Sequence, residues 1–209
     1  MAFRIEGYVI VSADGMLANA AHVMPDELRI EGDKNFFTAA LDRADLLVHG
    51  RNSGEAQTNS PKRQRLILTR GVPALAPDPA NPRATLWNPA GSTFEQAAEA
   101  AGVASGMVAI IGGPDVFGMF MDRFDTFWLS EAPKVKIPGG EGCFPGVPEF
   151  TPQQILKSHG LNPARHSCSM RPRMSPSRRG GAAIEALRVA TRPRRPARRR
   201  AVPVHSPRS

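Results

Sequence analysis

Short apolar runs separated by polar, glycine-bearing turns recur along the first 130 residues of the chain. The runs are rich in β-branched and aromatic residues, which is typical of buried strands, and segments with apolar positions three and four apart alternate with them and predict helices. The predicted strands cover 3–11, 46–48, 65–69, 85–87, 107–111 and 126–130, and the predicted helices cover 33–43, 94–101 and 116–124. This alternation predicts an α/β fold with a largely parallel sheet.

Two stretches between these elements have no regular apolar pattern and predict loops. Residues 18–32 separate the first strand from the first helix, a position suited to closing over a bound substrate. Residues 72–83 form a proline-rich connection. Before the helix over 94–101 stand Ser92 and Thr93, and either hydroxyl can cap its first turn.

The pattern changes completely after Leu161. Clusters of arginine and proline replace the apolar periodicity, so residues 162–209 cannot bury enough apolar surface to offset the entropy lost on ordering. Only residues 182–190 have the composition of a brief helix. We therefore predict one folded domain over 1–161, followed by an arginine- and proline-rich tail over 162–209 that is mostly disordered.

The formal net charge of +8 belongs to the tail and not to the domain. Residues 162–209 hold 13 arginines, no lysine and a single acid, Glu185, which gives a net charge of +12. Residues 1–161 hold 14 Lys and Arg against 18 Asp and Glu, a net charge of −4. Such a tail would bind nucleic-acid phosphates in a salt-dependent manner. Because it contains no aromatic residue to stack on bases, this binding would be non-specific.

The two cysteines, Cys143 and Cys168, lie in segments of different character and form no disulfide framework. Free thiols are typical of a reducing compartment. No stretch of the sequence approaches the ~18 apolar residues that a membrane span needs. We therefore predict a cytoplasmic protein, and no set of Cys, His, Asp and Glu has the spacing of a metal site.

Three predicted strands end in glycine-bearing turns. The strand over 107–111 is followed by Gly112-Gly113-Pro114-Asp115, and two others end in Gly50-Arg51-Asn52-Ser53 and Thr69-Arg70-Gly71. Glycine lacks the Cβ that would keep a ligand from the backbone, and ligands of open α/β sheets lie at the carboxyl ends of strands. Together the three ends predict a site for a phosphorylated dinucleotide, with Arg70 on a 2′-phosphate. Taken alone, Arg70 also fits a solvated loop charge.

A series of short motifs follows in order across residues 3–161. The motifs are Ser12-Ala13-Asp14-Gly15-Met16-Leu17-Ala18, Asp33 with Phe36-Phe37, Gly50-Arg51-Asn52-Ser53-Gly54-Glu55, Arg63-Gln64-Arg65-Leu66-Ile67-Leu68-Thr69-Arg70, Ile111-Gly112-Gly113-Pro114-Asp115-Val116-Phe117, Leu129-Ser130 and Cys143-Phe144-Pro145. Their order and spacing resemble the dihydrofolate reductase family in its wider sense, which includes the reductase domain of riboflavin biosynthesis. The resemblance implies a mixed, mostly parallel central sheet with flanking helices. It also implies an NADPH-dependent oxidoreductase that transfers a hydride to a C=N bond of a pterin or of a pyrimidine precursor of riboflavin.

The resemblance assigns the NADPH site to three segments. The residues assigned to the cofactor are Gly50, Arg51, Asn52, Ser53, Thr69, Arg70, Gly112, Gly113, Asp115, Val116 and Phe117. Gly50 would open a helix that meets the pyrophosphate, and Thr69 and Arg70 would face the adenosine 2′-phosphate. In the family the glycine pair is joined by a cis peptide, and an aromatic residue in the place of Phe117 lies near the nicotinamide.

The resemblance assigns the substrate to Asp33. Its carboxylate would anchor a 2-amino-4-oxo heterocycle through two parallel hydrogen bonds and, with a pKa raised by burial, assist delivery of a proton. Phe37, one helical turn later, would stack on the flat ring, and Phe36 is the less favoured partner. Asp33 also fits an acid in the first turn of a helix. Arg63 would contact an acidic substrate tail, or lie in a solvated basic loop.

The chain departs from the family pattern after residue 160. Members of the family end with paired strands that complete the sheet, whereas this sequence continues into the tail. We therefore expect the closing strands to be missing and a sheet edge to be exposed, which could favour a homodimer. A shifted reading frame produces such a break, a hypothesis that an intact frame in the resequenced gene would refute. Two alternatives to a working reductase are non-specific nucleic-acid binding through the tail and an inactive, degenerate reductase fold.

Overall fold

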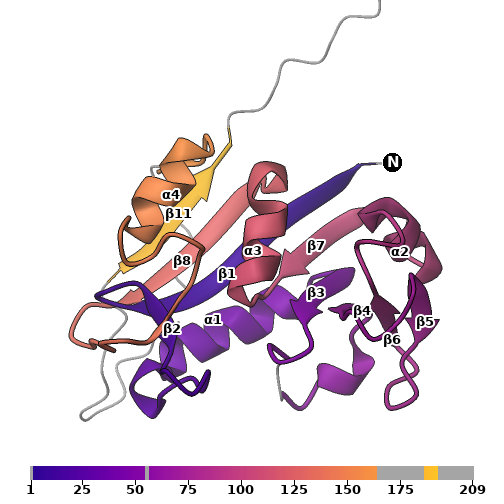
Figure 1. Cartoon of the computed structure of the whole chain (residues 1–209), viewed down its shortest axis with the longest axis horizontal. Coiled ribbons are helices and arrows are strands. Elements are labelled where there is room, and N and C mark those ends of the chain that lie inside the picture. Colours follow the sequence, from indigo (N-terminus) through magenta and orange to yellow (C-terminus); the bar gives the residue numbers. More distant parts are fainter. Residues whose placement is uncertain (1, 55–56, 164–185, 193–209) are drawn as a thin grey trace, which may run out of the picture.

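The computed structural model describes residues 2–54, 57–163 and 186–192, which are built around one nine-stranded sheet (Figure 1). The strand order is β10-β11-β8-β1-β7-β3-β4-β6-β5. The mutually parallel strands are β1 (Phe3–Ser12), β3 (Leu46–Gly50), β4 (Arg65–Leu68), β6 (Ala84–Trp87), β7 (Gly106–Ile110) and β8 (Thr126–Ala132). The strands that run antiparallel to their neighbours are β5 (Leu75–Pro77), β10 (Asn162–Pro163) and β11 (Ala186–Thr191), and a separate pair is formed by β2 (Met16–Ala18) and β9 (Glu141–Gly142).

Helices cover both faces of the sheet. The helix α1 (Glu31–Leu41) packs on one face against Tyr8 and Leu47. The helices on the other face are α2 (Phe94–Ala100), α3 (Pro114–Phe120) and α4 (Pro152–Ser158). The 3-10 turns of the described chain are η1 (Asp26–Leu28), η2 (Ser60–Lys62) and η3 (Met121–Arg123). Because both faces are covered, the central strands are continuous apolar runs, as parallel sheets require. The prediction of a largely parallel α/β fold is confirmed.

Capping side chains set the start of two helices. Thr93, one of the two predicted caps, accepts the N–H of Gln96 at 3.2 Å, and the side chain of Gln96 accepts the N–H of Thr93 at 2.9 Å. The same capping box joins Thr151 and Gln154 at the start of α4. Each box satisfies backbone N–H groups that the first helical turn leaves without a partner.

Several short elements differ from the prediction. The helix α4 has seven residues and buries Pro152 and Leu156, too short a pattern to distinguish from a loop in the sequence. The strand β5 lies within the proline-rich connection, and it is an edge strand, where proline is tolerated. The predicted helix after Gly50 is wrong, because Ser53 N–H closes a tight turn onto the carbonyl of Gly50 at 3.0 Å and no helix follows up to residue 54.

The end of the sheet also differs from the prediction. The expected absence of closing strands is wrong, because β11 pairs with β8 over the whole length Ala186–Thr191 and β10 pairs with the end of β11. The brief helix predicted over 182–190 is wrong for its described part, because Val189 and Ala190 are buried in a strand whose backbone bonds to β8. The predicted disorder of 164–185 and 193–209 lies outside the described residues. Among the described residues, no helix is long and apolar enough to cross a bilayer.

Candidate functional site

The carboxyl ends of β3, β4 and β7 meet at one edge of the sheet. There Gly50 N–H donates to the carbonyl of Gly112 at 2.8 Å, and Ile111 N–H donates to the carbonyl of Val48 at 3.0 Å. Next along the sheet, Thr69 N–H donates to the carbonyl of Trp87 at 2.9 Å. The structure therefore brings the three glycine-bearing turns of the sequence to neighbouring positions, as their placement after parallel strands predicts.

Glycine backbone forms the centre of this edge. The Gly112–Gly113 peptide is cis, as the resemblance implies. Gly112 has φ +101°, and a Cβ there would lie 2.9 Å from the ring of Phe117. A Cβ at Gly113 would lie 3.1 Å from Ser53 Oγ, and one at Gly50 would lie 3.6 Å from Val116 Cγ2. The lack of side chains leaves backbone at the centre of this edge, which we call the glycine cradle (Gly50, Gly112 and Gly113).

Two arginines flank the glycine cradle. Arg51 and Arg70 are exposed, and the backbone N–H of Gly71 donates to Thr69 Oγ1 at 3.0 Å. A Cβ at Gly71 would lie 3.7 Å from Arg51 Nη2, so the guanidinium of Arg51 approaches the turn that carries Arg70. Asn52 is exposed in the preceding turn. These cations and hydroxyls are suited to binding a phosphate group.

The buried side chains of Val116 and Phe117 pack against the core side of the glycine cradle. Val116 is 4% exposed and Phe117 is 1% exposed. The ring of Phe117 lies under Gly112 and packs edge-on against Phe127 and Phe144, at centroid distances of 5.5 and 5.9 Å. The structure therefore places the Phe117 ring in the core, with the Gly112 backbone between it and any ligand at the edge.

Asp33 lies on α1 and faces the end of β8. Its carboxyl is half-buried and lies near the hydroxyl of Ser130, which is 2% exposed and lowers the carboxyl's pKa by hydrogen bonding. Burial raises the pKa of Asp33, and the hydrogen bond to Ser130 offsets only part of this effect. The result is a carboxyl that holds its proton to higher pH than an ordinary aspartate, as the sequence predicts.

Phe37 and Phe36 follow Asp33 by one helical turn. Both are half-buried: Phe37 meets Tyr8 edge-on at 6.4 Å, whereas Phe36 packs on both Tyr8 and Trp128, at 6.2 and 5.2 Å. Of the two rings, Phe36 is the more firmly held in the core. Phe37 therefore stays the favoured candidate for a substrate contact.

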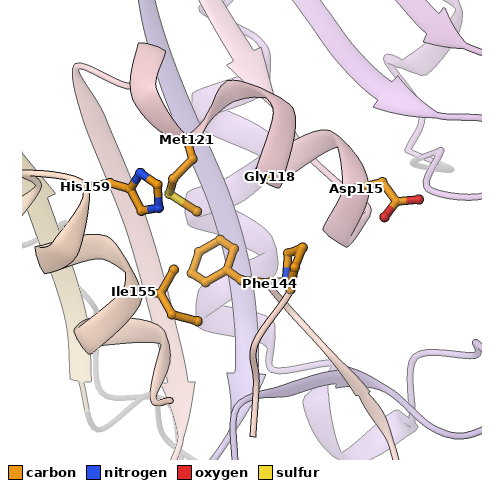
Figure 2. A pocket seen from close by; sticks show the side chains of 7 residues that line it. Asp115, Gly118, Met121, Phe144, Ile155 and His159 are labelled. Atoms are coloured by element: carbon orange, nitrogen blue, oxygen red, sulfur yellow. The ribbon is translucent and has the colours of Figure 1, made fainter. Parts of the chain in front are cut away.

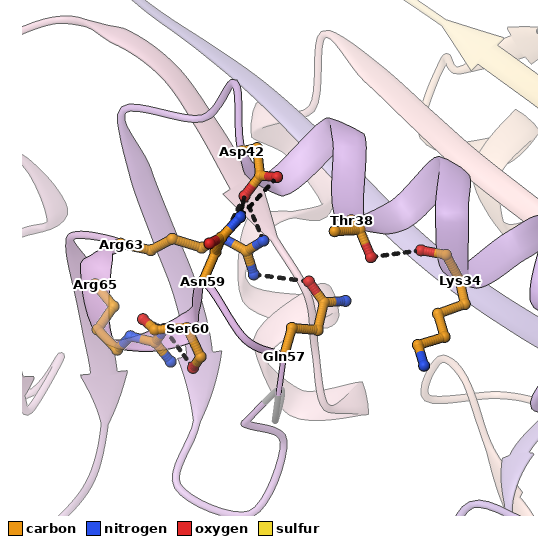
Figure 3. Close-up of polar contacts among 8 residues, drawn as sticks. All are labelled: Lys34, Thr38, Asp42, Gln57, Asn59, Ser60, Arg63 and Arg65. Atoms are coloured by element: carbon orange, nitrogen blue, oxygen red, sulfur yellow. Dashed lines mark hydrogen bonds and ion pairs between the residues drawn. The ribbon is translucent and has the colours of Figure 1, made fainter.

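Arg63 is turned into the protein. It is 6% exposed, and its guanidinium donates to Asp42 at 2.6 and 3.2 Å and to Gln57 Oε1 at 2.9 Å (Figure 3). Its neighbour Arg65 is buried as well and donates to the carbonyl and hydroxyl of Ser60. A substrate could bind Arg63, as the sequence predicts, only after the ion pair with Asp42 opens.

Asp115 is exposed in the first turn of α3 and lines a pocket of about 420 Å³ between α3 and α4 (Figure 2). The remaining lining residues are Gly118, Met121, Phe144, Pro145, Ile155 and His159. This pocket lies on the face of the sheet opposite α1 and Asp33. Asp115 thus borders two surfaces, the end of the glycine cradle and this separate pocket.

No model of a known protein family matches the sequence, and neither does any curated protein. Solved structures do match the fold. A protein assigned to riboflavin biosynthesis from Shewanella sp. PV-4 is 17% identical with a TM-score of 0.57, and the match covers 92% of this chain and 100% of that one. Dihydrofolate reductase from Enterococcus faecalis, complexed with NADP(H) and RAB-propyl, is 19% identical with a TM-score of 0.50 over 71% and 82% of the two chains. The chain has the dihydrofolate reductase-like fold.

A third structure with this fold belongs to a two-activity protein. It is the diaminohydroxyphosphoribosylaminopyrimidine deaminase/5-amino-6-(5-phosphoribosylamino)uracil reductase from Thermotoga maritima, 14% identical with a TM-score of 0.53. The match covers 91% of this chain and 57% of that one. At these identities the comparisons establish the dihydrofolate reductase-like fold of the chain, and the chemistry has to be argued from its own residues.

Ser130 is the site residue to which the sequence analysis assigned no role. It belongs to the motif Leu129-Ser130, but its influence on Asp33 links residues 97 positions apart in the chain, on α1 and β8. The signal in the sequence is that Ser130 follows Trp128 by two residues in a strand, so the two side chains lie on the same face of β8. In this structure that face is covered by α1, the helix that carries Asp33.

Proposed function

We propose that the protein is an NADPH-dependent reductase that adds a hydride to the C=N bond of a flat heterocycle of the pterin or pyrimidine type. The observation that carries the proposal is the joint presence, at the carboxyl edge of one sheet, of the glycine cradle and the Asp33–Ser130 pair. A dinucleotide can contact the main chain of the glycine cradle, and the Asp33 carboxyl can donate a proton to the substrate.

The residues of the cradle fit a phosphorylated nicotinamide dinucleotide. The three positions without a Cβ let a ligand contact the main chain, and Ser53, Thr69, Arg51 and Arg70 supply hydroxyls and cations for its phosphates. Arginine recognises phosphate through two parallel hydrogen bonds that lysine cannot match. The dihydrofolate reductase with the same fold is complexed with NADP(H), which supports this choice of cofactor.

In the proposed reduction the cofactor would supply the hydride and the protein would supply the proton. When bound, NADPH supplies the hydride to the carbon of the C=N bond and leaves as NADP⁺. The nitrogen needs one proton, and Asp33, with its raised pKa, can bind a proton from water and hold it at the substrate nitrogen. Ser130 fixes the orientation of the carboxyl, and Phe37 would hold the ring in plane. The carboxyl regains its proton from water after each turnover.

Cofactor binding is the first test. NADPH is titrated into the full chain and followed by its fluorescence, beside NADH and the variants Arg70→Ala and Arg51→Ala. We expect binding that prefers NADPH and weakens at least tenfold in each variant, a loss of about 1.4 kcal/mol. Arg83→Ala is the matched control, because Arg83 is exposed at the start of β6, at the opposite edge of the sheet. Failure of the folded chain to bind NADPH would refute the reductase and favour an inactive fold.

Substrate reduction is the second test. Dihydrofolate and 5-amino-6-(5-phosphoribosylamino)uracil represent the two substrate types named for proteins of this fold. We expect one of them to drive oxidation of NADPH in the wild-type chain and not in Asp33→Asn, which keeps the shape of the side chain but has no titrating proton. Turnover by Asp33→Asn at the wild-type rate would remove Asp33 from the mechanism.

A further inference from the structure

A second buried carboxylate lies beneath α1, outside the site proposed above. Glu6 of β1 is 3% exposed, and its Oε2 accepts hydrogen bonds from the phenol of Tyr8 at 2.6 Å and from the indole N–H of Trp128 at 2.8 Å. Its Oε1 lies 2.7 Å from Arg4 Nε. A carboxylate is tolerated in a protein interior when both oxygens are bonded in this way. Through Trp128 this carboxylate joins β1 to β8.

The hydrogen bonds of Glu6 hold two rings in a fixed stack. Tyr8 and Trp128 are parallel to within 6°, with centroids 6.3 Å apart. Phe36 of α1 packs over Trp128 at 5.2 Å, and Phe37 meets Tyr8 at 6.4 Å. We call the two rings on the sheet (Tyr8 and Trp128) the aromatic floor. The helix α1 therefore rests on an aromatic floor whose orientation is set by a carboxylate.

The aromatic floor and the two α1 rings that pack on it, Phe36 and Phe37, adjoin the Asp33–Ser130 pair. Ser130 follows Trp128 by two residues in β8, so both side chains are on the face that α1 covers. Asp33 precedes Phe36 and Phe37 by one turn of α1. The contact between Asp33 and Ser130 therefore depends on how closely α1 is held against β8, which the floor determines.

We propose that Trp128 is a positioning residue of the proposed reductase: held by Glu6, its ring seats α1 against β8, so that the Asp33 carboxyl stays on Ser130 and is shielded from water. The inference rests on the proton-holding role proposed for Asp33. Loosening the ring would let water reach the carboxyl, and the proton would be lost at lower pH.

The charges around the floor are few. Arg4 and Glu6 lie on β1, and Arg43, which follows α1, acts on the phenol of Tyr8 together with Arg4. Burial, followed by the hydrogen bond to Glu6, raises the pKa of Tyr8 far above its ordinary value, so the phenol remains a donor. Among the described residues, burial and Ser130 are the two causes that act on Asp33. Replacing Trp128 by phenylalanine therefore changes packing and one donor but no charge.

The test is a direct titration of Asp33 in the full chain without cofactor or substrate. The chain is labelled with ¹³C-carboxyl aspartate, and the Asp33 signal is assigned by its loss in Asp33→Asn. We expect the titration midpoint of Asp33 to move to lower pH in Trp128→Phe. Trp87→Phe is the matched control, because Trp87 is 2% exposed, donates its indole N–H to the carbonyl of Ser92 at 3.0 Å and packs on the other face of the sheet.

An unchanged midpoint in Trp128→Phe, or an equal shift in Trp87→Phe, would overturn the proposal. Should Trp128→Phe not fold, Tyr8→Phe removes a single hydroxyl from the same carboxylate and should move the midpoint in the same direction. The sample contains neither cofactor nor substrate. Failure of the reductase proposal, seen as missing NADPH binding, is therefore distinguishable from failure of this one.

Discussion

The carboxylate of Asp14 accepts the backbone N–H of Ile137 at 3.1 Å from each of its two oxygens. The hydroxyl of Ser12 donates to the same carboxylate at 2.5 Å, and Ala13 N–H donates to the carbonyl of Val135 at 2.8 Å. The turn after β1 is therefore joined to the loop after β8, and both lie at the carboxyl edge of the sheet. One side chain thus holds together two segments at this edge of the sheet.

We expect Asp14→Asn to lower the free energy of unfolding by roughly 1–2 kcal/mol near neutral pH, because asparagine loses the negative charge and one of the two oxygens that accept from Ser12 and Ile137. Partial burial raises the pKa of Asp14, but the hydrogen bonds from Ser12 and Ile137 outweigh it and keep the pKa below its usual value. This stabilisation is present above the unfolded pKa and is lost as pH falls through the folded pKa. In denaturant unfolding, the free energies of unfolding of the wild type and of Asp14→Asn should therefore become equal in acid. Asp26→Asn, at an exposed pair with Arg29, should change little.

Asp33→Asn should raise stability near neutral pH and leave it unchanged in acid. Because burial raises the pKa of Asp33, the folded state pays no penalty below the unfolded pKa, and the penalty grows as pH rises through the folded pKa. Asparagine carries no charge and therefore has no such penalty. Thermal unfolding across pH 3 to 8 checks this. A variant whose melting temperature follows that of the wild type at every pH would show that the carboxyl carries no such penalty.

Gly113→Ala should weaken NADPH binding at least tenfold, about 1.4 kcal/mol, with little loss of stability. Gly113 has φ −72°, which alanine adopts readily, and the new methyl would lie 3.1 Å from Ser53 Oγ, inside the glycine cradle. Gly118→Ala is the control, because Gly118 is exposed on α3 and its Cβ would only touch Pro145 at 3.4 Å. Equal NADPH affinities for the two variants would argue against a cofactor in the cradle.

Arg63→Ala should destabilise the fold by about 2 kcal/mol, since it leaves Asp42 and Gln57 without their shared donor. The figure is below that of a fully buried pair because the Asp42 side chain is 39% exposed. Lys62→Ala, one residue earlier and exposed, should stay within about 0.5 kcal/mol of the wild type. Chemical denaturation measures both. A normal stability for Arg63→Ala would show that the bonds of Arg63 to Asp42 and Gln57 contribute little to the fold.

The sheet was largely predictable because its strands are buried on both faces. Leu46, Leu47 and Val48 are completely buried, and such runs are visible in the sequence without any knowledge of their partners. The closing strand β11 was not predictable from its own residues. It is defined by pairing with β8, where Thr191 meets Thr126 at a distance of 65 positions, and a six-residue segment in arginine-rich surroundings gives no such information.

In the candidate site, too, local features were predictable from the sequence and contacts between distant segments were not. Glycines and charged residues at strand ends indicated the cradle and Asp33, because their conformational and charge requirements are local properties. Burial of Arg63 and the contact between Asp33 and Ser130 depend on which side chains meet in space, from α1 to η2 and from α1 to β8. Position within a motif therefore located these residues in the chain but did not reveal their partners.

The central place of β1 affects how the chain folds during synthesis. Both of its neighbours are made long after it, since Phe3 pairs with Gly106 and Glu6 pairs with Thr126. At about 5–20 residues per second, the strand spends roughly 5–20 s outside the ribosome before either partner has left it. During that interval its apolar side chains and free backbone groups are open to chaperones and to other nascent chains. The fold therefore forms late, and the first strand to be made must remain unpaired until the middle of the molecule has been synthesised.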